Sequence, residues 1–307
     1  MIRFNNFSEG QEDFFLIEIV DNESTTNILV DGGIDPENCL DHIKKNVEGK
    51  LDYIILTHID QDHIKGLLKL LDDKVVESKV KDTVFVYNKF TTGIISYRQA
   101  EKFEELIKGR EIICSYREYQ YNSGNAIFLS AEQRRKLPKK EKSQIYITFL
   151  SPTARKEIEL LYDYYQQYKE KHKNPSGNEY VVNKSSIMCL IEFEEALLLM
   201  TGDGYLKDIL PTIEMLTGPK TICPLSKNVL IKIPHHGSYK NNEGLEEIIK
   251  LIPCEKFVLT NVDKKSLSKN NAVKIADYIL NLSQEKTIYS NSEYEGLNAD
   301  DKQSIEL

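Results

Sequence analysis

The sequence contains no apolar run long enough to cross a bilayer, which takes about 20 consecutive apolar residues. Residues 1–7 lack a basic stretch followed by an apolar segment and a cleavage site, so no secretory signal is indicated. We therefore expect a cytoplasmic protein that does not act at a membrane. Internal repeats and low-complexity tracts are also missing, which argues against repeat and fibrous architectures.

Cysteine is sparse, with five residues spread along the chain and none in a Cys-x-x-Cys pair. Neither a thiolate zinc site nor a disulfide framework is therefore indicated. We interpret the cysteines as structural residues, and Cys189, inside an apolar run, is typical of a small core side chain. The Gly-x-Ser-x-Gly elbow is absent as well, so serine-hydrolase chemistry has no support.

Positive charge is in deficit. The formal net charge of −8 argues mildly against nonspecific binding of nucleic acid by the whole surface. A polyanionic substrate stays compatible with this balance, because two divalent cations would make an active site locally positive.

Apolar strands alternate with amphipathic helices in two strand-rich halves. In the first half we predict strands over residues 14–20, 27–30, 51–57, 83–87 and 144–150, and helices over residues 35–47, 64–71, 97–107 and 154–173. In the second half we predict strands over residues 186–193, 196–200, 229–233, 256–260 and 287–289, and helices over residues 245–251 and 272–280. Residues 134–142 are expected to form a basic, exposed loop or helix end, and residues 298–307 to be frayed.

This pattern predicts an α/β (αββα) protein in which two packed mixed β-sheets are flanked by helices. At 307 residues the chain is slightly long for one domain, but one domain over residues 1–307 fits the pattern better than two. We expect insertions near residues 88–143 and 153–182, which could form a cap or a docking surface.

Metal-binding residue types follow directly after the strand over residues 51–57. His58, Asp60, Asp62 and His63 lie within six residues of one another, which is unlike a polar loop that holds histidines by chance. Histidine and aspartate suit zinc, manganese or iron, and the carboxylates shift the preference toward harder ions. A strand end also holds such side chains rigidly, as a metal centre requires.

Two further strands end in residues of the same kind. Asp203 follows the strand over residues 196–200 and lies between glycines, where a carboxylate can approach and bridge two metals, although Gly-Asp-Gly is also a common turn. His235 and His236 follow the strand over residues 229–233.

Together and in this order, the three segments resemble the metallo-β-lactamase superfamily, and within it the hydrolase domain of ComEC-type DNA-uptake proteins. The segment from His58 to His63 is similar to the family's His-x-His-x-Asp-His motif, with Asp60 in place of the second histidine. Residues 28–33 resemble the family's early strand and its aspartate. The Asn-x-x-Ser of residues 183–186, the Thr-Gly-Asp of residues 201–203 and the Pro-His-His-Gly-Ser of residues 234–238 look like signatures of the same branch.

The resemblance implies the metallo-β-lactamase fold and a dinuclear site for two divalent ions, zinc or manganese. Six metal ligands are implied: His58, Asp60, Asp62, His63, Asp203 and His236. One ion would be bound by Asp62, His63 and His236, and the other by His58 and Asp60, with Asp203 bridging the two.

Supporting roles are implied for three further positions. Asp31 and Ser238 would lie behind the ligands and orient them, Asp31 through hydrogen bonds. His236 is preferred to His235 as the ligand, because the family's last ligand usually precedes glycine. His235 would then act in catalysis beside Asp62, by orienting the substrate or by donating a proton to the leaving group.

The sequence departs from the family pattern in two ways. Asp60 replaces an imidazole with a carboxylate, and the family's extra histidine between the first motif and Asp203 has no counterpart. The only histidine in that interval, His172, lies among charged residues and is interpreted as a solvated surface residue, and His42 as structural. One metal position is therefore rich in oxygen and short of ligands, which favours manganese, or zinc with a weakly held second ion.

The leading functional hypothesis is a metal-dependent hydrolase, most plausibly a phosphodiesterase or nuclease that uses a metal-activated hydroxide. The basic residues 134–142 and four tyrosines could contact a nucleic acid, or could form a solvated loop and a packed helix stripe. The four tyrosines are Tyr162, Tyr164, Tyr165 and Tyr168. The alternatives are hydrolysis of a small-molecule ester, lactone or phosphoryl ester, and a metal-binding effector or interaction subunit that has protein partners in a larger, defence-type assembly.

Overall fold

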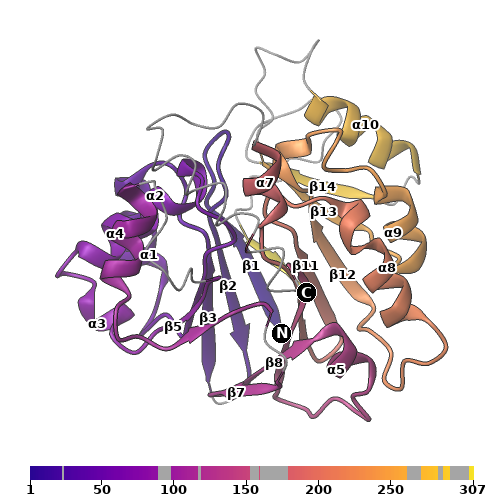
Figure 1. Ribbon diagram of the computed structural model, residues 1–307, viewed down its shortest axis with the longest axis horizontal. Helices are drawn as coiled ribbons and strands as arrows, with labels where there is room; N and C mark the ends of the chain where they lie inside the picture. The colour runs from indigo at the N-terminus through magenta and orange to yellow at the C-terminus, as the bar shows by residue number, and fades with distance from the viewer. Residues whose placement is uncertain are drawn as a thin grey trace.

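The computed structural model describes residues 1–22, 24–88, 98–116, 119–152, 159, 179–260, 271–282, 286–290 and 304–307. Within these residues, two mixed β-sheets lie between two layers of helices (Figure 1). The predicted αββα arrangement is confirmed. No helix in the described ranges is long and apolar enough to cross a membrane.

The first sheet has seven strands in the order β15-β1-β2-β3-β4-β5-β6. Strands β1, β2 and β3 pair antiparallel, and β3, β4, β5 and β6 pair parallel. The strands are β1 (Ile2–Asn6), β2 (Phe15–Val20), β3 (Thr25–Val30), β4 (Tyr53–Ile55), β5 (Val84–Val86), β6 (Ile112–Ile113) and β15 (Ser304–Glu306).

The second sheet has eight strands in the order β14-β13-β12-β11-β10-β9-β8-β7. Strands β9, β10 and β11 pair antiparallel, and β11, β12, β13 and β14 pair parallel. The strands are β7 (Tyr121–Ser123), β8 (Ala126–Ser130), β9 (Ile145–Ser151), β10 (Met188–Phe193), β11 (Ala196–Met200), β12 (Asn228–Lys232), β13 (Lys256–Leu259) and β14 (Thr287–Ser290).

Side chains of both sheets meet in one buried layer. Ile17 and Ile28 reach it from the first sheet, and Ile191 and Leu198 reach it from the second. Successive side chains of a strand point to opposite faces, so Leu16, next to Ile17, belongs instead to the core beneath the helices. The central strands are buried on both faces, which explains their nearly continuous apolar sequences.

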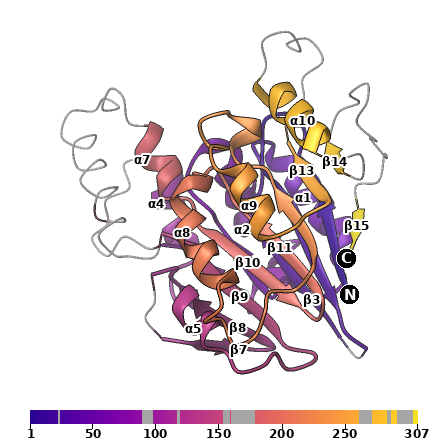
Figure 2. The ribbon, with the colours of Figure 1, turned by 90° about the vertical axis from the view of Figure 1, so that its right-hand side faces the viewer.

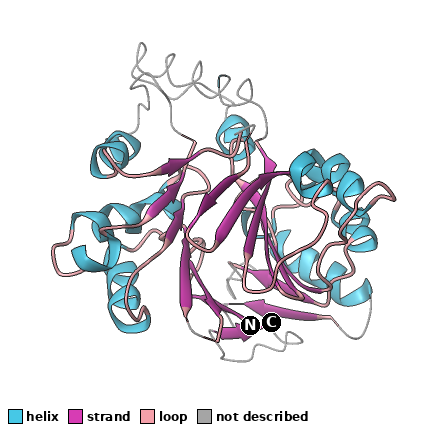
Figure 3. Ribbon diagram, turned by 90° about the horizontal axis from the view of Figure 1, so that it is seen from below, coloured by secondary structure: helices cyan, strands magenta, loops and turns pink. Residues whose placement is uncertain are grey.

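Helices cover the outer face of each sheet. In Figure 2, α8, α9 and α10 lie in front of the second sheet, and Figure 3 shows helices on both sides of the strands from below. The helices on the first sheet are α1 (Pro36–Asn46), α2 (Gln61–Asp72) and α4 (Arg98–Leu106), and those on the second are α8 (Leu206–Thr217), α9 (Leu245–Leu251) and α10 (Asn271–Leu282). The short helices are α3 (Glu77–Val80), α5 (Ala131–Arg135), α7 (Glu179–Lys184) and the 3₁₀ turn η1 (His235–Gly237).

Two expectations from the sequence are wrong in part. Arg134 is fully buried rather than exposed, and its guanidinium pairs with Glu192 in β10. The end of the chain is not frayed throughout, because β15 pairs with β1. The remaining residues of that predicted frayed segment lie outside the described ranges.

The segments predicted as insertions differ in how much of them the structure describes. Of the segment near residues 88–143, the described part supplies α4 and α5 to the helical layers, β6 to the first sheet, and β7 and β8 to the second. The segment near residues 153–182, with its predicted helix, lies mostly outside the described residues.

Candidate metal centre

The three motifs come together at one end of the double sheet. Strands β3 and β4 run parallel in the first sheet, and β11 and β12 run parallel in the second, so their carboxyl ends carry the loops on which the motifs lie. His63 Nε2 is 3.6 Å from Asp203 Oδ1, and His236 Nε2 is 3.2 Å from Asp62 Oδ2. Residues separated by more than 170 positions are therefore in direct contact.

Four of the predicted ligands form a compact group. One donor atom from each of Asp62, His63, Asp203 and His236 lies within 4.8 Å of the others. His63 Nε2 is also 3.5 Å from Asp62 Oδ2. Two imidazoles and two carboxylates at this spacing are a donor set that binds divalent zinc, manganese or iron.

Some donor atoms at the centre of the site lack hydrogen-bond partners among the described residues. Among the described residues, His58 Nε2, His63 Nε2 and Asp203 Oδ1 are buried and form no hydrogen bond. Buried polar atoms are nearly always paired, because each unpaired one costs about 1–3 kcal/mol. A divalent cation between them would satisfy all three, so the residues present fit a metal.

His63 is held in one orientation from behind. Its Nδ1 lies 2.7 Å from Asp31 Oδ2, and Asp31 also accepts from the Thr57 backbone N–H at 2.8 Å and from the Thr57 hydroxyl at 2.6 Å. With Nδ1–H donated to Asp31, Nε2 faces the metal centre, where a bound ion would take its lone pair in place of a proton. Asp31 lies in the left-handed region, with φ of 56°, which costs an aspartate about 1 kcal/mol.

His236 is oriented by a second buried network. Its Nδ1 lies 2.8 Å from Thr260 Oγ1, and the Thr260 hydroxyl donates to Asp13 Oδ1 at 3.1 Å. Asp13 Oδ2 forms an ion pair with Lys232 Nζ, which also donates to the Gly202 carbonyl at 3.0 Å. This arrangement fixes the ring with Nε2 directed toward Asp62 Oδ2, 3.2 Å away.

Sequence reasoning missed Asp13, Lys232 and Thr260. Lys232 did give a signal, since it is a lone cation in the apolar strand β12, directly before the histidine pair, and it is fully buried. Asp13 and Thr260 gave none, because each is an ordinary polar residue at the edge of a strand.

The remaining predicted ligands form a looser group beside Asp203. His58 Nε2 lies 3.5 Å from Asp60 Oδ2 and 3.9 Å from Asp203 Oδ2. Asp60 is the N-cap residue of α2, but its carboxylate caps no backbone N–H, and its side chain is 44% exposed. His235 Nε2 lies 3.6 Å from the same Asp203 oxygen.

The turn that carries the two histidines is strained. His235 and His236 both have left-handed backbone angles, with φ of 46° and 49°. Ser238 supports this turn through its backbone: its N–H donates to the His235 carbonyl at 2.8 Å, and its carbonyl accepts from the Asn242 amide at 2.8 Å. Strain of this kind persists where the surroundings hold it, and it clusters at functional sites.

Helix α2 approaches the first sheet closely because two glycines face each other. A β-carbon on Gly66 would lie 1.8 Å from the Gly32 carbonyl oxygen, and one on Gly32 would lie 2.6 Å from the Leu67 nitrogen. The Gly32 N–H donates to the His63 carbonyl at 2.8 Å. This contact sets the position of His63 and Asp62 at the start of the helix.

The charges of the centre shift one another's protonation. Burial would lower the pKa of His63, but the carboxylates of Asp31, Asp203 and Asp62 hold it well above its usual value. Burial would raise the pKa of Asp203 and Asp62, yet the neighbouring imidazoles lower both. In the metal-free protein, positive charge on His63 thus offsets the carboxylates, in the place that fits a divalent cation.

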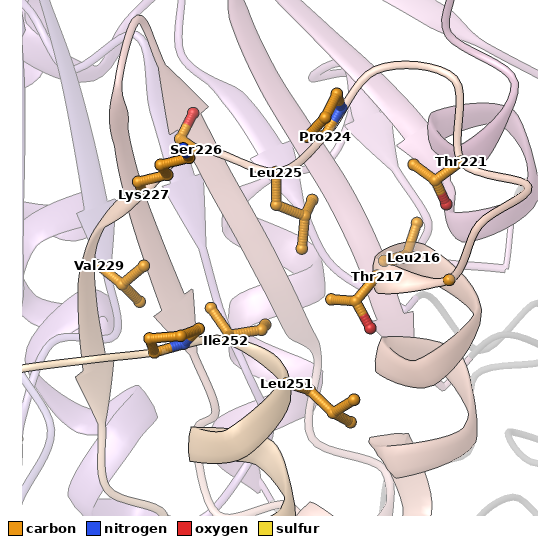
Figure 4. Close-up of a pocket in the computed structure, with 12 residues that line it drawn as sticks. Leu216, Thr217, Thr221, Pro224, Leu225, Ser226, Lys227, Val229, Leu251 and Ile252 are labelled. Atoms are coloured by element: carbon orange, nitrogen blue, oxygen red, sulfur yellow. The ribbon is translucent and has the colours of Figure 1, made fainter.

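The other singled-out residues lie elsewhere or outside the described ranges. His42 stacks on Phe7 with ring centroids 4.3 Å apart and contacts Asn46, as a structural residue would. His172 and the four tyrosines lie outside the described residues. A pocket of about 340 Å³ lies at the start of β12, between the ends of α8 and α9, and so at the opposite end of that strand from the histidine pair (Figure 4).

Comparison with known proteins agrees with this architecture. A sequence profile of the metallo-beta-lactamase superfamily matches residues 8–88, which include the segment from His58 to His63. A diphosphatase of the PhnP family has a TM-score of 0.50 at 12% identity, over 97% of this chain and 85% of that one. CmlA, a diiron beta-hydroxylase from Streptomyces venezuelae, also has a TM-score of 0.50, at 10% identity over 95% of this chain and 53% of that one, so the chain spans about half its length.

A third structure, Tm1679, is described as a metal-dependent hydrolase of the beta-lactamase superfamily. It has 14% identity and a TM-score of 0.48 over 100% of this chain and 99% of that one. No curated protein sequence matches the chain significantly. The two-sheet architecture is that of the metallo-β-lactamase fold, and the findings support the expected superfamily. The ComEC-type branch stays a prediction.

Proposed function

We propose that the protein is a metal-dependent hydrolase that cleaves phosphodiester bonds in nucleic acid or in a nucleotide-like substrate. The observation that carries this proposal is the compact group of Asp62, His63, Asp203 and His236, in which His63 Nε2 and Asp203 Oδ1 are buried and form no hydrogen bond. A fold that leaves charged donors buried and facing one another is built around a cation.

The compact group would hold one ion, and His58, Asp60 and Asp203 would contribute to a second position. Bound divalent ions lower the pKa of the attacking water and offset the negative charge that develops on phosphoryl oxygens. Lys232, at 4.0 Å from Asp203 Oδ1, adds a fixed positive charge behind the bridging carboxylate. Asp31 and Thr260 fix the two imidazoles so that little reorganisation is needed.

The chemistry of the donors favours a phosphoryl substrate. Asp60 stands where the related motif has an imidazole, so the second position is rich in carboxylate oxygen and suits a hard ion such as Mn²⁺. Hard ions bind phosphate oxygens well and are the common partners of phosphoryl transfer. The fold relative described as a diphosphatase adds support of the same kind, although at 12% identity it shows only that this fold accommodates such chemistry.

The three buried cysteines offer no competing nucleophile. Burial raises the pKa of the Cys189 and Cys254 thiols to about 12, and it raises that of Cys39 as well. A thiol attacks as the thiolate, which these three residues do not form near neutral pH.

The test begins with metal analysis of the purified full chain, followed by removal of metal and reloading with Mn²⁺ or Zn²⁺. The loaded protein is then incubated with bis-p-nitrophenyl phosphate and with labelled single-stranded DNA. We expect cleavage that depends on the added ion and is abolished by a chelator.

A small ester and a cephalosporin serve as competing substrates in the same assay. A loaded protein that hydrolyses either of these and leaves both phosphodiesters intact would contradict the phosphodiesterase proposal. A protein that takes up no metal would contradict the hydrolase proposal altogether.

A further inference from the structure

We infer that both adjacent histidines are metal ligands, one for each ion, and that His235 supplies the imidazole that the second position otherwise lacks. This inference rests on the proposed function only insofar as the site binds metal; it does not depend on the substrate. It assigns His235 a role different from substrate orientation or proton donation.

The two carboxylate oxygens of Asp203 face different histidines and therefore different metal positions. Asp203 Oδ1 is 3.6 Å from His63 Nε2, on the side of the compact group. Asp203 Oδ2 is 3.9 Å from His58 Nε2 and 3.6 Å from His235 Nε2. His235 therefore lies beside the second position with His58, whereas His236 lies beside the first.

The hydrogen bonds behind His235 set its ring in the state that a ligand needs. The side-chain nitrogen of Asn241 donates to the Asp203 carbonyl at 2.7 Å, so its oxygen must point the other way, and it lies 3.2 Å from His235 Nδ1. Asn241 can therefore only accept a proton from Nδ1. With Nδ1–H donated, Nε2 presents its lone pair to the side of Asp203 Oδ2.

The Asn-x-x-Ser motif contacts the same pair of residues. Asn183 Nδ2 lies 3.1 Å from His235 Nδ1, and exchanging the nearly equivalent oxygen and nitrogen positions of this amide lets its oxygen share the Nδ1–H with Asn241. Ser186 Oγ accepts from the Asp203 backbone N–H at 3.3 Å. One short segment thus positions both His235 and Asp203, which a residue that only touches substrate would not require.

The second position is more open than the first. The side chains of His235 and Asp60 are 37% and 44% exposed, whereas that of His63 is fully buried. Within the described part of the chain, the compact groups of possible ligands do not include His58, Asp60 or His235. These side chains must move closer together to share an ion, so we expect the second ion to bind more weakly than the first.

The experiment is a titration of metal-free protein with Mn²⁺, in which the free ion is measured by electron paramagnetic resonance. The wild type should bind two equivalents, one tightly and one weakly. His235→Ala should lose the weak equivalent and keep the tight one, as should His58→Ala. Asp62→Ala should lose the tight equivalent, and Asn241→Ala should weaken the second by about 10- to 100-fold. His42→Ala, which removes a histidine away from the site, should bind as the wild type does.

A spectroscopic variant tests ligation directly and does not depend on the loss of a side chain. His235→Cys loaded with Co²⁺ should show thiolate-to-metal charge-transfer absorption in the near ultraviolet, whereas His42→Cys should not. Two equivalents bound by His235→Ala with wild-type affinities, or a Co²⁺-loaded His235→Cys without this band, would overturn the inference. A wild type that binds no Mn²⁺, Zn²⁺ or Co²⁺ would instead contradict the proposed function.

Discussion

Two clusters of buried charge lie on the second sheet, and they differ in whether the protein satisfies them. One is the pair of Arg134 and Glu192, both fully buried, near the start of β11 and β12. The guanidinium donates to both carboxylate oxygens, at 2.6 Å and 3.0 Å, and to the carbonyls of Cys223 and Pro224 at 2.8 Å and 3.1 Å. The Ser226 N–H donates to the same carboxylate at 3.2 Å.

The metal centre, at the other ends of β11 and β12, is also buried and charged. There His63 Nε2 and Asp203 Oδ1 stay without hydrogen bonds while lying 3.6 Å apart. Both clusters bear the desolvation cost of burying charge, but only the metal centre leaves buried charged donor atoms without hydrogen bonds. Buried charge that is satisfied internally indicates structure, and buried charge with unsatisfied atoms that face one another indicates a ligand.

The largest expected effect is the loss of catalytic activity when a residue of the metal centre is substituted. Asp203→Ala removes the carboxylate that faces both metal positions, so we expect turnover of the phosphodiester probe to fall by about 10³-fold or more, equivalent to roughly 4 kcal/mol. Steady-state kinetics and metal content on the same samples measure this. His172→Ala is the matched control and should be nearly silent; equal losses in both variants would break the ligand assignment.

The stability of the fold should instead depend on the Arg134–Glu192 pair. Glu192→Gln leaves the Arg134 charge buried without its partner, so the free energy of unfolding should drop by about 3–5 kcal/mol. Urea denaturation measures the loss, and the folded variant should still bind metal as the wild type does. A variant that unfolds at the wild-type urea concentration would show that this ion pair contributes nothing net.

Metal addition should stabilise only a protein whose centre is intact. At a Mn²⁺ concentration 100-fold above the dissociation constant, the free energy of unfolding should rise by about 2.7 kcal/mol. Thermal unfolding with and without the ion tests this, in the wild type, in Glu192→Gln and in Asp203→Ala. The gain should survive in Glu192→Gln and shrink in Asp203→Ala, and a uniform gain would mean that the ion binds elsewhere.

The smallest expected effect is the pH dependence of the stability that the Arg134–Glu192 pair contributes. Burial would raise the pKa of Glu192, but the hydrogen bonds and charge of Arg134 lower it below its usual value. The pair therefore stabilises the fold above the unfolded-state pKa of about 4.3, and this contribution is lost as the pH falls through the lower folded-state pKa. The stability difference between the wild type and Glu192→Gln should thus narrow below about pH 4, and a difference that stays constant down to pH 2 would contradict this account.

Most of the fold could be predicted from local patterns. The strands that became β2, β10 and β11 were evident because their apolar residues are continuous or alternate and end at turn residues. Strands β1, β6, β7, β8 and β15 and helices α3, α7 and α8 were missed. Pro211 lies inside α8, and proline within a helical pattern normally argues against a helix.

The candidate ligands were also evident, because each follows a strand end within a short motif. The residues that orient these ligands through hydrogen bonds were not evident from the sequence. Asp13, Thr260 and Asn241 each act on a site residue far away in the sequence, and nothing in their own neighbourhood distinguishes them. Arg134 is a second example of this limit. It lies in a basic run, which predicts an exposed side chain, but it is paired with Glu192 in the core.

The sequence by itself determined the alternation of strands and helices and the three short motifs that hold His58 to His63, Asp203 and the histidine pair, because periodicity and ligand spacing are local properties. Only the tertiary structure decided which oxygen of Asp203 faces which histidine, and which charges are satisfied from within. Those outcomes depend on how the ends of parallel strands in two different sheets meet, and no local spacing encodes that approach.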